Sequence, residues 1–237
     1  MTPLRLSLCM LSAFAVLSLQ ACATTHTYSA KPITATVVDA ETGEPLEGVN
    51  VVAQWDLHDP WPTWGGAGAL ELIEAITDKN GQFHIPGWES KAIPSDRLPG
   101  TRLGNADPGM ILFKSGYQVR SIGNDLQPNH LRDESHTWVR YSDWDGKVIK
   151  LERFKGSLDL YTANTSGTLR GIGFRTECAW KKMPRFLVAL MKEKERLERA
   201  GEGYPYNTIP SIETIDREFG NRGNCGSVKD FFKEYMK

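Results

Sequence analysis

The stretch between residues 55 and 64 concentrates side chains that could bind a ligand. It holds three tryptophans and three polar residues: Trp55, Trp61, Trp64, Asp56, His58 and Asp59. An exposed tryptophan face can stack on a sugar ring, and tryptophan is enriched where proteins contact their partners. We therefore predict a binding loop carried by Trp55, Trp61 and Trp64, beside the flexible run Gly65–Gly68. The alternative is that these rings fold back under the loop as a small satellite core.

A second cluster holds the densest group of metal-binding residue types, namely His130, Asp133 and His136. Imidazole and carboxylate groups are common zinc ligands. On a helix His130 and Asp133 would share one face, whereas in a loop all three side chains could converge. The alternative is a solvated polar loop. We predict no metal site and no cofactor.

Familiar catalytic motifs are absent from the sequence. There is no Gly-x-Ser-x-Gly nucleophile elbow, and each Gly-x-Gly run lacks the third glycine of a dinucleotide-binding fingerprint. The formal charge is −1, so the chain has no long-range field to attract nucleic acid. We predict that the protein is not an enzyme, has no catalytic residues and binds no nucleic acid.

The candidate residues lie among segments that alternate apolar and polar side chains, which is the period of a β-strand. Four segments show it: Ile33–Val38, Val49–Trp55, Ala75–Thr77 and Gln82–Ile85. The last two flank Asn80-Gly81, a pair that suits a hairpin turn. Long insertions at 56–70 and 87–108 interrupt the pattern, and loops of this length are uncommon unless they are functional or disordered.

Three motifs follow one another through these strands: Asp39-Ala-Glu-Thr-Gly-Glu-Pro-Leu-Glu-Gly-Val-Asn-Val51, Thr77-Asp-Lys-Asn-Gly-Gln-Phe83 and Met110-Ile-Leu-Phe-Lys-Ser-Gly-Tyr117. In this order they resemble the carboxypeptidase regulatory-like family, also called transthyretin-like or prealbumin-like. The resemblance implies a mainly β protein with an Ig-like or transthyretin-like antiparallel sandwich over residues 32–153, serving as a binding or scaffolding module. No histidine is followed three residues later by glutamate, so the resemblance does not extend to a zinc carboxypeptidase site.

The N-terminus indicates export. Arg5 precedes an uncharged stretch of 14 residues, Leu6–Leu19, which is shorter than the roughly 20 apolar residues of a membrane-spanning helix and fits a secretory signal. The next residues, Leu19-Gln-Ala-Cys22, resemble the lipobox of bacterial lipoproteins. This resemblance implies that residues 1–21 are removed and that Cys22 carries lipid.

Lipid on Cys22 implies stable attachment to a membrane. Ala23 after the cysteine implies, again by resemblance, sorting to the outer membrane, with the domain facing the periplasm or the cell surface. We expect residues 22–31 to be a short tether. The alternative is an ordinary signal peptide, cut near Ala21 or Ala23 and carrying no lipid.

Residues 154–237 are predicted to form a small helical part, mostly helical from about residue 178. Apolar residues recur at helical spacing between Pro184 and Gly201, and shorter helices are expected at 211–219 and after Ser227. In an oxidising compartment Cys178 and Cys225 are predicted to form a disulfide, the alternative being two free buried thiols.

Together these features predict a non-enzymatic envelope lipoprotein that binds an envelope protein or a glycan through the sandwich loops. Two alternatives stay open. One is a metal-dependent hydrolase with an unfamiliar site at His130, Asp133 and His136. The other is a structural subunit of an envelope assembly.

Overall fold

The computed structural model describes residues 27–63, 65–125, 130–132, 138–169, 172, 178–200, 209–217 and 225–236. Within these residues the strands are Thr27–Ala30 (β1), Ile33–Asp39 (β2), Asn50–His58 (β3), Gly66–Ile76 (β4), Gln82–Ile85 (β5), Trp88–Ala92 (β6), Arg102–Leu103 (β7), Gly109–Phe113 (β8), Arg120–Ile122 (β9), His130–Arg132 (β10), Trp138–Arg140 (β11) and Val148–Leu151 (β12). The helices are Leu158–Leu169 (α2), Pro184–Ala200 (α3), Ile212–Ile215 (α4) and Val228–Lys233 (α5), with a 3₁₀ turn at Ala179–Lys182 (η2).

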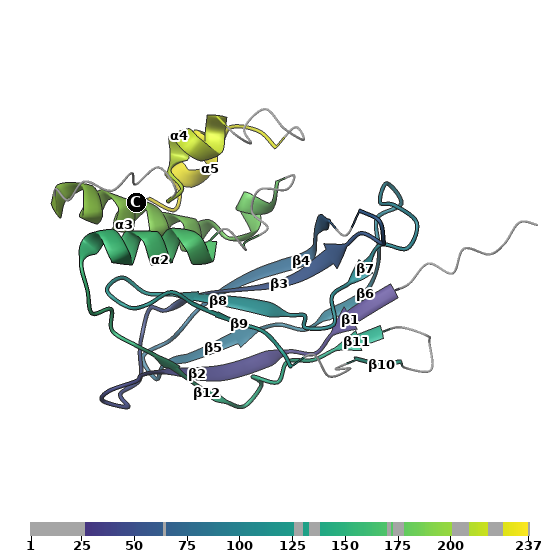
Figure 1. Ribbon diagram of the computed structural model, residues 1–237, viewed down its shortest axis with the longest axis horizontal. Coiled ribbons are helices and arrows are strands. Elements are labelled where there is room, and N and C mark those ends of the chain that lie inside the picture. Colours follow the sequence, from purple (N-terminus) through teal and green to yellow (C-terminus); the bar gives the residue numbers. More distant parts are fainter. Residues whose placement is uncertain are drawn as a thin grey trace, which may run out of the picture.

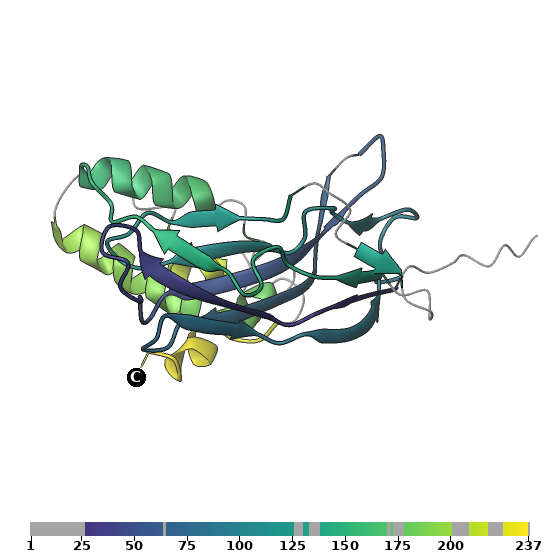
Figure 2. The same ribbon diagram turned by 90° about the horizontal axis from the view of Figure 1, so that it is seen from below.

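Three β-sheets form two layers that stack face to face, and helices cover the outer face of one layer (Figure 1). The covered sheet, which we call the central sheet, has the order β4-β3-β8-β9, with β7 paired to the end of β3. The second layer consists of β12-β2-β5 and β10-β11-β1-β6. Because β1 leads almost directly into β2 and β5 into β6, these two parts continue each other along the molecule (Figure 2).

This architecture confirms the predicted fold class, a mainly β antiparallel sandwich with a small helical part. Within the described residues the strand pairs are antiparallel apart from β1 with β11 and β2 with β12. The alternation of Ile33, Ala35 and Val37 places these side chains inward, where all three are buried. The predicted strands at 33–38 and 49–55 correspond to β2 and β3.

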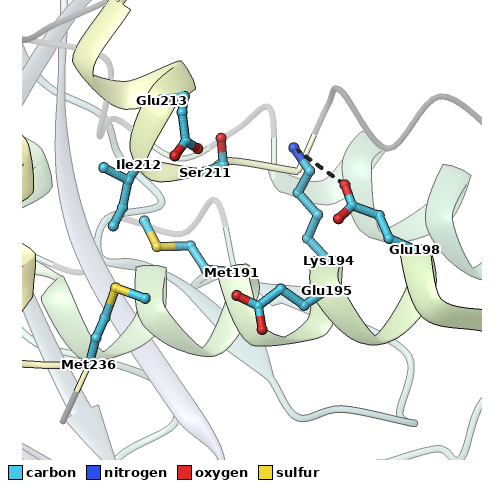
Figure 3. A pocket seen from close by; sticks show the side chains of 8 residues that line it. All are labelled: Met191, Lys194, Glu195, Glu198, Ser211, Ile212, Glu213 and Met236. Carbon is cyan, nitrogen blue, oxygen red and sulfur yellow. Dashed lines mark ion pairs between the residues drawn. The ribbon is translucent and has the colours of Figure 1, made fainter.

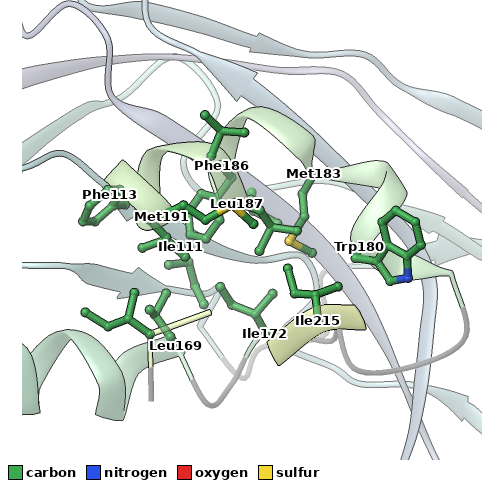
Figure 4. Packing of buried hydrophobic residues seen from close by; sticks show 14 of the residues in the cluster. Ile111, Phe113, Leu169, Ile172, Trp180, Met183, Phe186, Leu187, Met191 and Ile215 are labelled. Atoms are coloured by element: carbon green, nitrogen blue, oxygen red, sulfur yellow. The ribbon is translucent and has the colours of Figure 1, made fainter. Parts of the chain in front are cut away.

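The core between the two layers is filled from the inward faces of both. Its large buried members include Trp55, Leu57, Phe83, Ile85, Leu103, Met110, Leu112, Ile149 and Leu151. The outward face of β8 is apolar as well, and the outward face of β3 carries Val52 between the polar residues Asn50 and Gln54. Val52, Ile111 and Phe113 pack under the helices, against side chains such as Phe186 and Leu187 of α3 (Figure 4). The two middle strands of the central sheet, β3 and β8, are therefore buried on both faces.

A buried carboxylate closes the sandwich at the end where β2 stops. Asp39 is 1% exposed and accepts hydrogen bonds from the backbone N–H groups of Glu41 and Thr42 and from the Tyr117 hydroxyl. Arg153 forms an ion pair with the same carboxylate at 2.8 Å. The Glu41 N–H, followed by the Tyr117 hydroxyl, lowers the pKa of Asp39 to about 2. The aspartate of the first motif and the tyrosine of the third are thus tied together.

The predicted disulfide is confirmed. Cys178 and Cys225 are bonded, with their Cα atoms 5.5 Å apart and 47 positions apart in the chain. Cys178 precedes η2 and Cys225 precedes α5, so the bond ties the start of η2 to the start of the last helix. In the chain-entropy account a loop of this length is worth about 4 kcal/mol.

Two expectations about the first strands are corrected. Residues 22–31 are not only a tether, because Thr27–Ala30 form β1 and bury Tyr28 and Ala30 in the core. The turn at Asn80-Gly81 does not join a hairpin, because β4 pairs with β3 in the central sheet and β5 pairs with β2 in the other layer. Gly81 does need its positive φ of 72°, since a Cβ there would lie 2.4 Å from the Val37 carbonyl oxygen.

The helical part begins earlier than expected, with α2 at Leu158 instead of at about residue 178. Its sequence, LDLYTANTSGTL, has almost no apolar stripe, because small polar residues such as Thr162, Thr165 and Ser166 occupy the buried positions. The helix expected from Pro184 is confirmed as α3. The two expected after it correspond to the shorter α4 and α5.

Burial on both faces of β3 makes a prediction about stability. Replacing Val52, which faces the helices, with alanine should lower the free energy of unfolding by about 2 kcal/mol, because the substitution removes methyl groups from a closed core. Chemical denaturation of the full chain measures the change, with Lys79→Ala at an exposed turn as the control. A Val52→Ala protein as stable as the unsubstituted one would mean that the helices do not seal this face.

Candidate functional site

The three tryptophans of the predicted binding loop occupy different environments. Trp55 is 1% exposed and belongs to the inter-sheet core, where it meets the Trp88 ring edge-on at a centroid distance of 5.5 Å. It therefore cannot contact a partner. Trp64 lies outside the described residues. Trp61 is 73% exposed, the highest value among the exposed large hydrophobic side chains of the described residues.

The loop that carries Trp61 is the tip of a long hairpin made by β3 and β4. The insertion predicted at 56–70 is thus largely strand, and the glycines expected to give flexibility, Gly66 and Gly68, begin β4. The Asp59 N–H donates to the Gly65 carbonyl at 2.9 Å and closes the tip. The Thr101 hydroxyl donates to the Asp59 carboxylate at 2.8 Å and ties the tip to the 93–101 segment.

A shallow cavity of about 410 Å³ opens at the base of this tip. It is lined by Asp59, Gly66, Ala67, Gly68, Asp96, Arg97 and Leu98. Leu98 is 49% exposed. We call Trp61 together with these lining residues the hairpin-tip surface. Trp61 is not itself a lining residue, but it follows Asp59 by two positions on the same tip, and the carboxylates and guanidinium group of the lining could accept and donate hydrogen bonds to a polar ligand.

A buried polar cluster lies in the sandwich at the same end. Asp107 is 6% exposed, and its Oδ2 has no hydrogen-bond partner in the described part of the chain. Arg140 is 3% exposed and stacks on the Tyr28 ring with 5.3 Å between the guanidinium carbon and the ring centroid. Asp56 accepts a 2.9 Å hydrogen bond from Gln54. Burying polar and charged side chains costs free energy unless they are hydrogen-bonded or paired, so these groups need polar neighbours at this end of the sandwich.

Proton binding by the two carboxyl groups of this cluster is shifted toward neutral pH. Burial raises the pKa of Asp56 to about 6. Burial, reinforced by the negative charge of Asp56, raises the pKa of Asp107 to about 8. At pH 7 Asp107 therefore holds its proton, and the pair can take up or release protons between about pH 6 and pH 8. Gly104 allows the close approach, since a Cβ there would lie 3.0 Å from His58 Nε2 and 3.4 Å from Asp107 Oδ2.

Asp107 and Arg140 are not among the site residues predicted from the sequence. They are separated by 33 positions, belong to no motif, and lie in stretches with no clear hydrophobic period. Only the pairing of β11 with β1 and of β7 with β3 brings the segments around them to one end of the sandwich. Asp56 belongs to the predicted binding loop, where we expected it to lie on the surface.

The alternative metal site at His130, Asp133 and His136 lies largely outside the described residues. His130 begins β10, whereas Asp133 and His136 lie outside the described residues. Elsewhere in the described chain no three His, Cys, Asp or Glu side chains gather as a metal site. Cys22 also lies outside the described residues. No helix among the described residues is both long and apolar enough to cross a membrane.

No protein-family model and no curated protein matches the chain. Among solved structures it is similar to 3-chlorocatechol 1,2-dioxygenase from Rhodococcus opacus 1CP, with 18% identity, a TM-score of 0.30 and coverage of 55% of this chain and 62% of that one. It is also similar to catechol 1,2-dioxygenase from Acinetobacter radioresistens, with 14% identity, a TM-score of 0.25 and coverage of 57% and 54%. The matched region spans less than two thirds of either enzyme.

The expectation that the chain is not an enzyme is corrected by these neighbours, because they are themselves enzymes. The absence of a familiar catalytic motif therefore does not exclude catalysis. At this identity and TM-score the similarity transfers no reaction, substrate or residue role to this chain.

The raised pKa of Asp107 predicts how stability depends on pH. A carboxyl group that holds its proton more tightly when folded stabilises fully below its unfolded pKa of 3.8, and this contribution is lost as pH rises through about 8. Replacing Asp107 with asparagine, which stays neutral, should remove most of the fall in unfolding free energy between pH 4 and 8. At pH 8 the variant should exceed the unsubstituted protein by at least about 1 kcal/mol.

Denaturation at a series of pH values measures this. Asp96→Asn is the control, because the Asp96 side chain is 70% exposed. An Asp107→Asn protein that loses stability with pH as steeply as the unsubstituted protein would show that Asp107 ionises normally.

Proposed function

We propose that this protein is a lipid-anchored envelope protein whose sandwich binds an envelope protein or a glycan through the hairpin-tip surface. The observation that carries the proposal is the exposure of Trp61, 73%, on a tip held in place by backbone and side-chain hydrogen bonds. Leaving so large an apolar ring in water costs free energy, and tryptophan is prominent among residues that dominate binding.

The surroundings of Trp61 suit a ligand that is both flat and polar. A sugar ring could stack on the indole while its hydroxyls bond to Asp59, Asp96 or Arg97. A protein partner would instead use Trp61 and the half-exposed Leu98 as an apolar anchor. Both partners need Trp61, and a binding experiment distinguishes them.

The position of the proposed lipid anchor also favours the hairpin-tip surface as the binding site. β1 begins at Thr27, five residues after Cys22, so the span between lipid and sheet is at most ~18 Å. Thr27 lies at the end of the sandwich where β3 finishes and the hairpin tip begins (Figure 1). An anchor on Cys22 would hold the hairpin-tip surface close to the membrane, where envelope partners are concentrated.

Trp61→Ala should abolish partner capture. Affinity purification of the intact protein from detergent-solubilised envelope, read by mass spectrometry and by glycan analysis, should yield a dominant partner. We expect its recovery to fall at least tenfold in Trp61→Ala, with Leu160→Ala, which removes another exposed side chain on α2, as the control. Equal recovery with Trp61→Ala would exclude this surface.

The anchor has its own test. Cys22→Ser should abolish incorporation of radiolabelled fatty acid and leave either uncleaved precursor or protein released from the membrane fraction. Cys9→Ser is the matched control, since Cys9 lies in the predicted signal and its loss should leave labelling unchanged. Labelling that persists in Cys22→Ser would mean that this cysteine is not the lipid attachment site.

A further inference from the structure

A second groove, of about 390 Å³, runs between α3 and the end of β8. Its floor is formed by Asn50, Phe113 and Ala189, and its rim carries Lys114, Lys192, Arg196 and Arg199. Glu193 is the one acidic residue among its lining residues. Four cations thus surround a space that contains one carboxylate, in a chain whose formal charge is −1. The positive charge of the groove is a local feature.

The carboxylate of Glu193 is already engaged. It is 2% exposed and accepts two hydrogen bonds from Arg196, at 2.7 and 3.0 Å, and one from the Ser115 hydroxyl at 2.6 Å. Lys114 donates to the Glu47 carbonyl, which carries no charge. In the described part of the chain, Lys192 and Arg199 form no ion pair, so the groove keeps three cations without a carboxylate partner.

Helix α3 separates its charges between two cavities. On its other side, a cavity of about 250 Å³ is lined by Glu195, Glu198, Glu213 and Lys194, with Met191 and Met236 (Figure 3). Lys194 faces Glu198 there at 4.0 Å. Glu195 follows Lys192 by three residues and precedes Arg199 by four, so it is a neighbour of both on the helix surface. In the described part of the chain it forms no ion pair with either, and it lines the second cavity instead. Like charges at Lys192 and Arg196, four residues apart, weaken a helix unless something compensates them.

The helix dipole accounts for part of this pattern only. Cations in the last turn of a helix are favourable, which covers Arg199 near the end of α3 at Ala200. Lys192 lies two turns before that end, and Lys114 follows a strand. Their convergence on one groove needs another cause.

We propose that this groove is a binding site for a phosphate-bearing ligand. Arg199 presents a planar fork of donors and Lys114 and Lys192 present mobile ammonium groups, the two side-chain types that bind phosphate oxygens. Asn50, 9% exposed on the floor, adds a side-chain amide that donates a long hydrogen bond of 3.5 Å to the Gly48 carbonyl. The cavity has the size of a small-molecule site.

The site is independent of the hairpin-tip surface. Asn50 and Phe113 pair at the start of β3, whereas the hairpin tip follows His58 at its end, about 26 Å away along the strand. If Cys22 is anchored beside the tip, the groove faces away from that membrane. The phosphate could belong to a soluble molecule or to a lipid headgroup, and the two sources can be told apart.

Isothermal titration calorimetry on the purified full-length protein tests the proposal with two probes, inorganic pyrophosphate and short-chain phosphatidylglycerol below its micelle concentration. We expect saturable binding of at least one probe, weakened by added salt. The double variant Lys192→Gln/Arg199→Gln should bind at least tenfold more weakly, and Lys229→Gln, an exposed lysine on α5, should bind normally. Both altered residues are exposed, so the fold should survive, which a melting curve checks.

Binding of pyrophosphate would identify a soluble phosphate as sufficient, and binding of phosphatidylglycerol alone would identify a lipid headgroup. Either result supports the proposal if the double variant no longer binds the same probe. No binding of either probe, or binding that the double variant retains, would overturn it. Neither result bears on Trp61, so failure here leaves the hairpin-tip surface to its own test.

Discussion

The structure depends on two adjacent strands, β3 and β8, that are buried on both faces. β3 and β8 bury Val51, Ala53 and Trp55 against the second layer, and Val52 and Phe113 under the helices. A half-exposed sheet would need no helical layer, but this one would leave a large apolar surface in water. The helices, and the disulfide that links them, are therefore part of the same folding unit as the sandwich.

The central strand also sets the distance between the two candidate binding regions. At one end of β3 the chain runs into the hairpin tip with Trp61, and the half-buried Asp56 and the buried Asp107 lie at the same end of the sandwich. At the other end Asn50 forms the floor of the basic groove. Because a strand buried on both faces is rigid, the two regions are held apart at a fixed spacing, and one ligand is not expected to reach both.

Local periodicity in the sequence predicted the strands and helices well, but it did not predict which segments lie next to one another in the fold. The period of two identified β2 and β3, and the period of 3.6 identified α3, because burial on one side leaves a repeating pattern. α2 escaped notice because threonine and serine fill its buried side. Trp55 alternates with Val51 and Ala53, and this pattern indicates burial. The prediction of a binding loop gave more weight to the three closely spaced tryptophans. The Asp107–Arg140 neighbourhood could not be predicted, since it arises from strand pairing alone.

The central claim is that the hairpin-tip surface meets the partner, and photo-crosslinking in intact cells tests it most directly. A photoreactive benzoylphenylalanine would replace Thr63, an exposed residue two positions from Trp61, and, separately, Leu160, which is 51% exposed on the helical layer. The account predicts a discrete crosslinked product from position 63 and none from position 160. Products from position 160 alone, or none from either position, would contradict it.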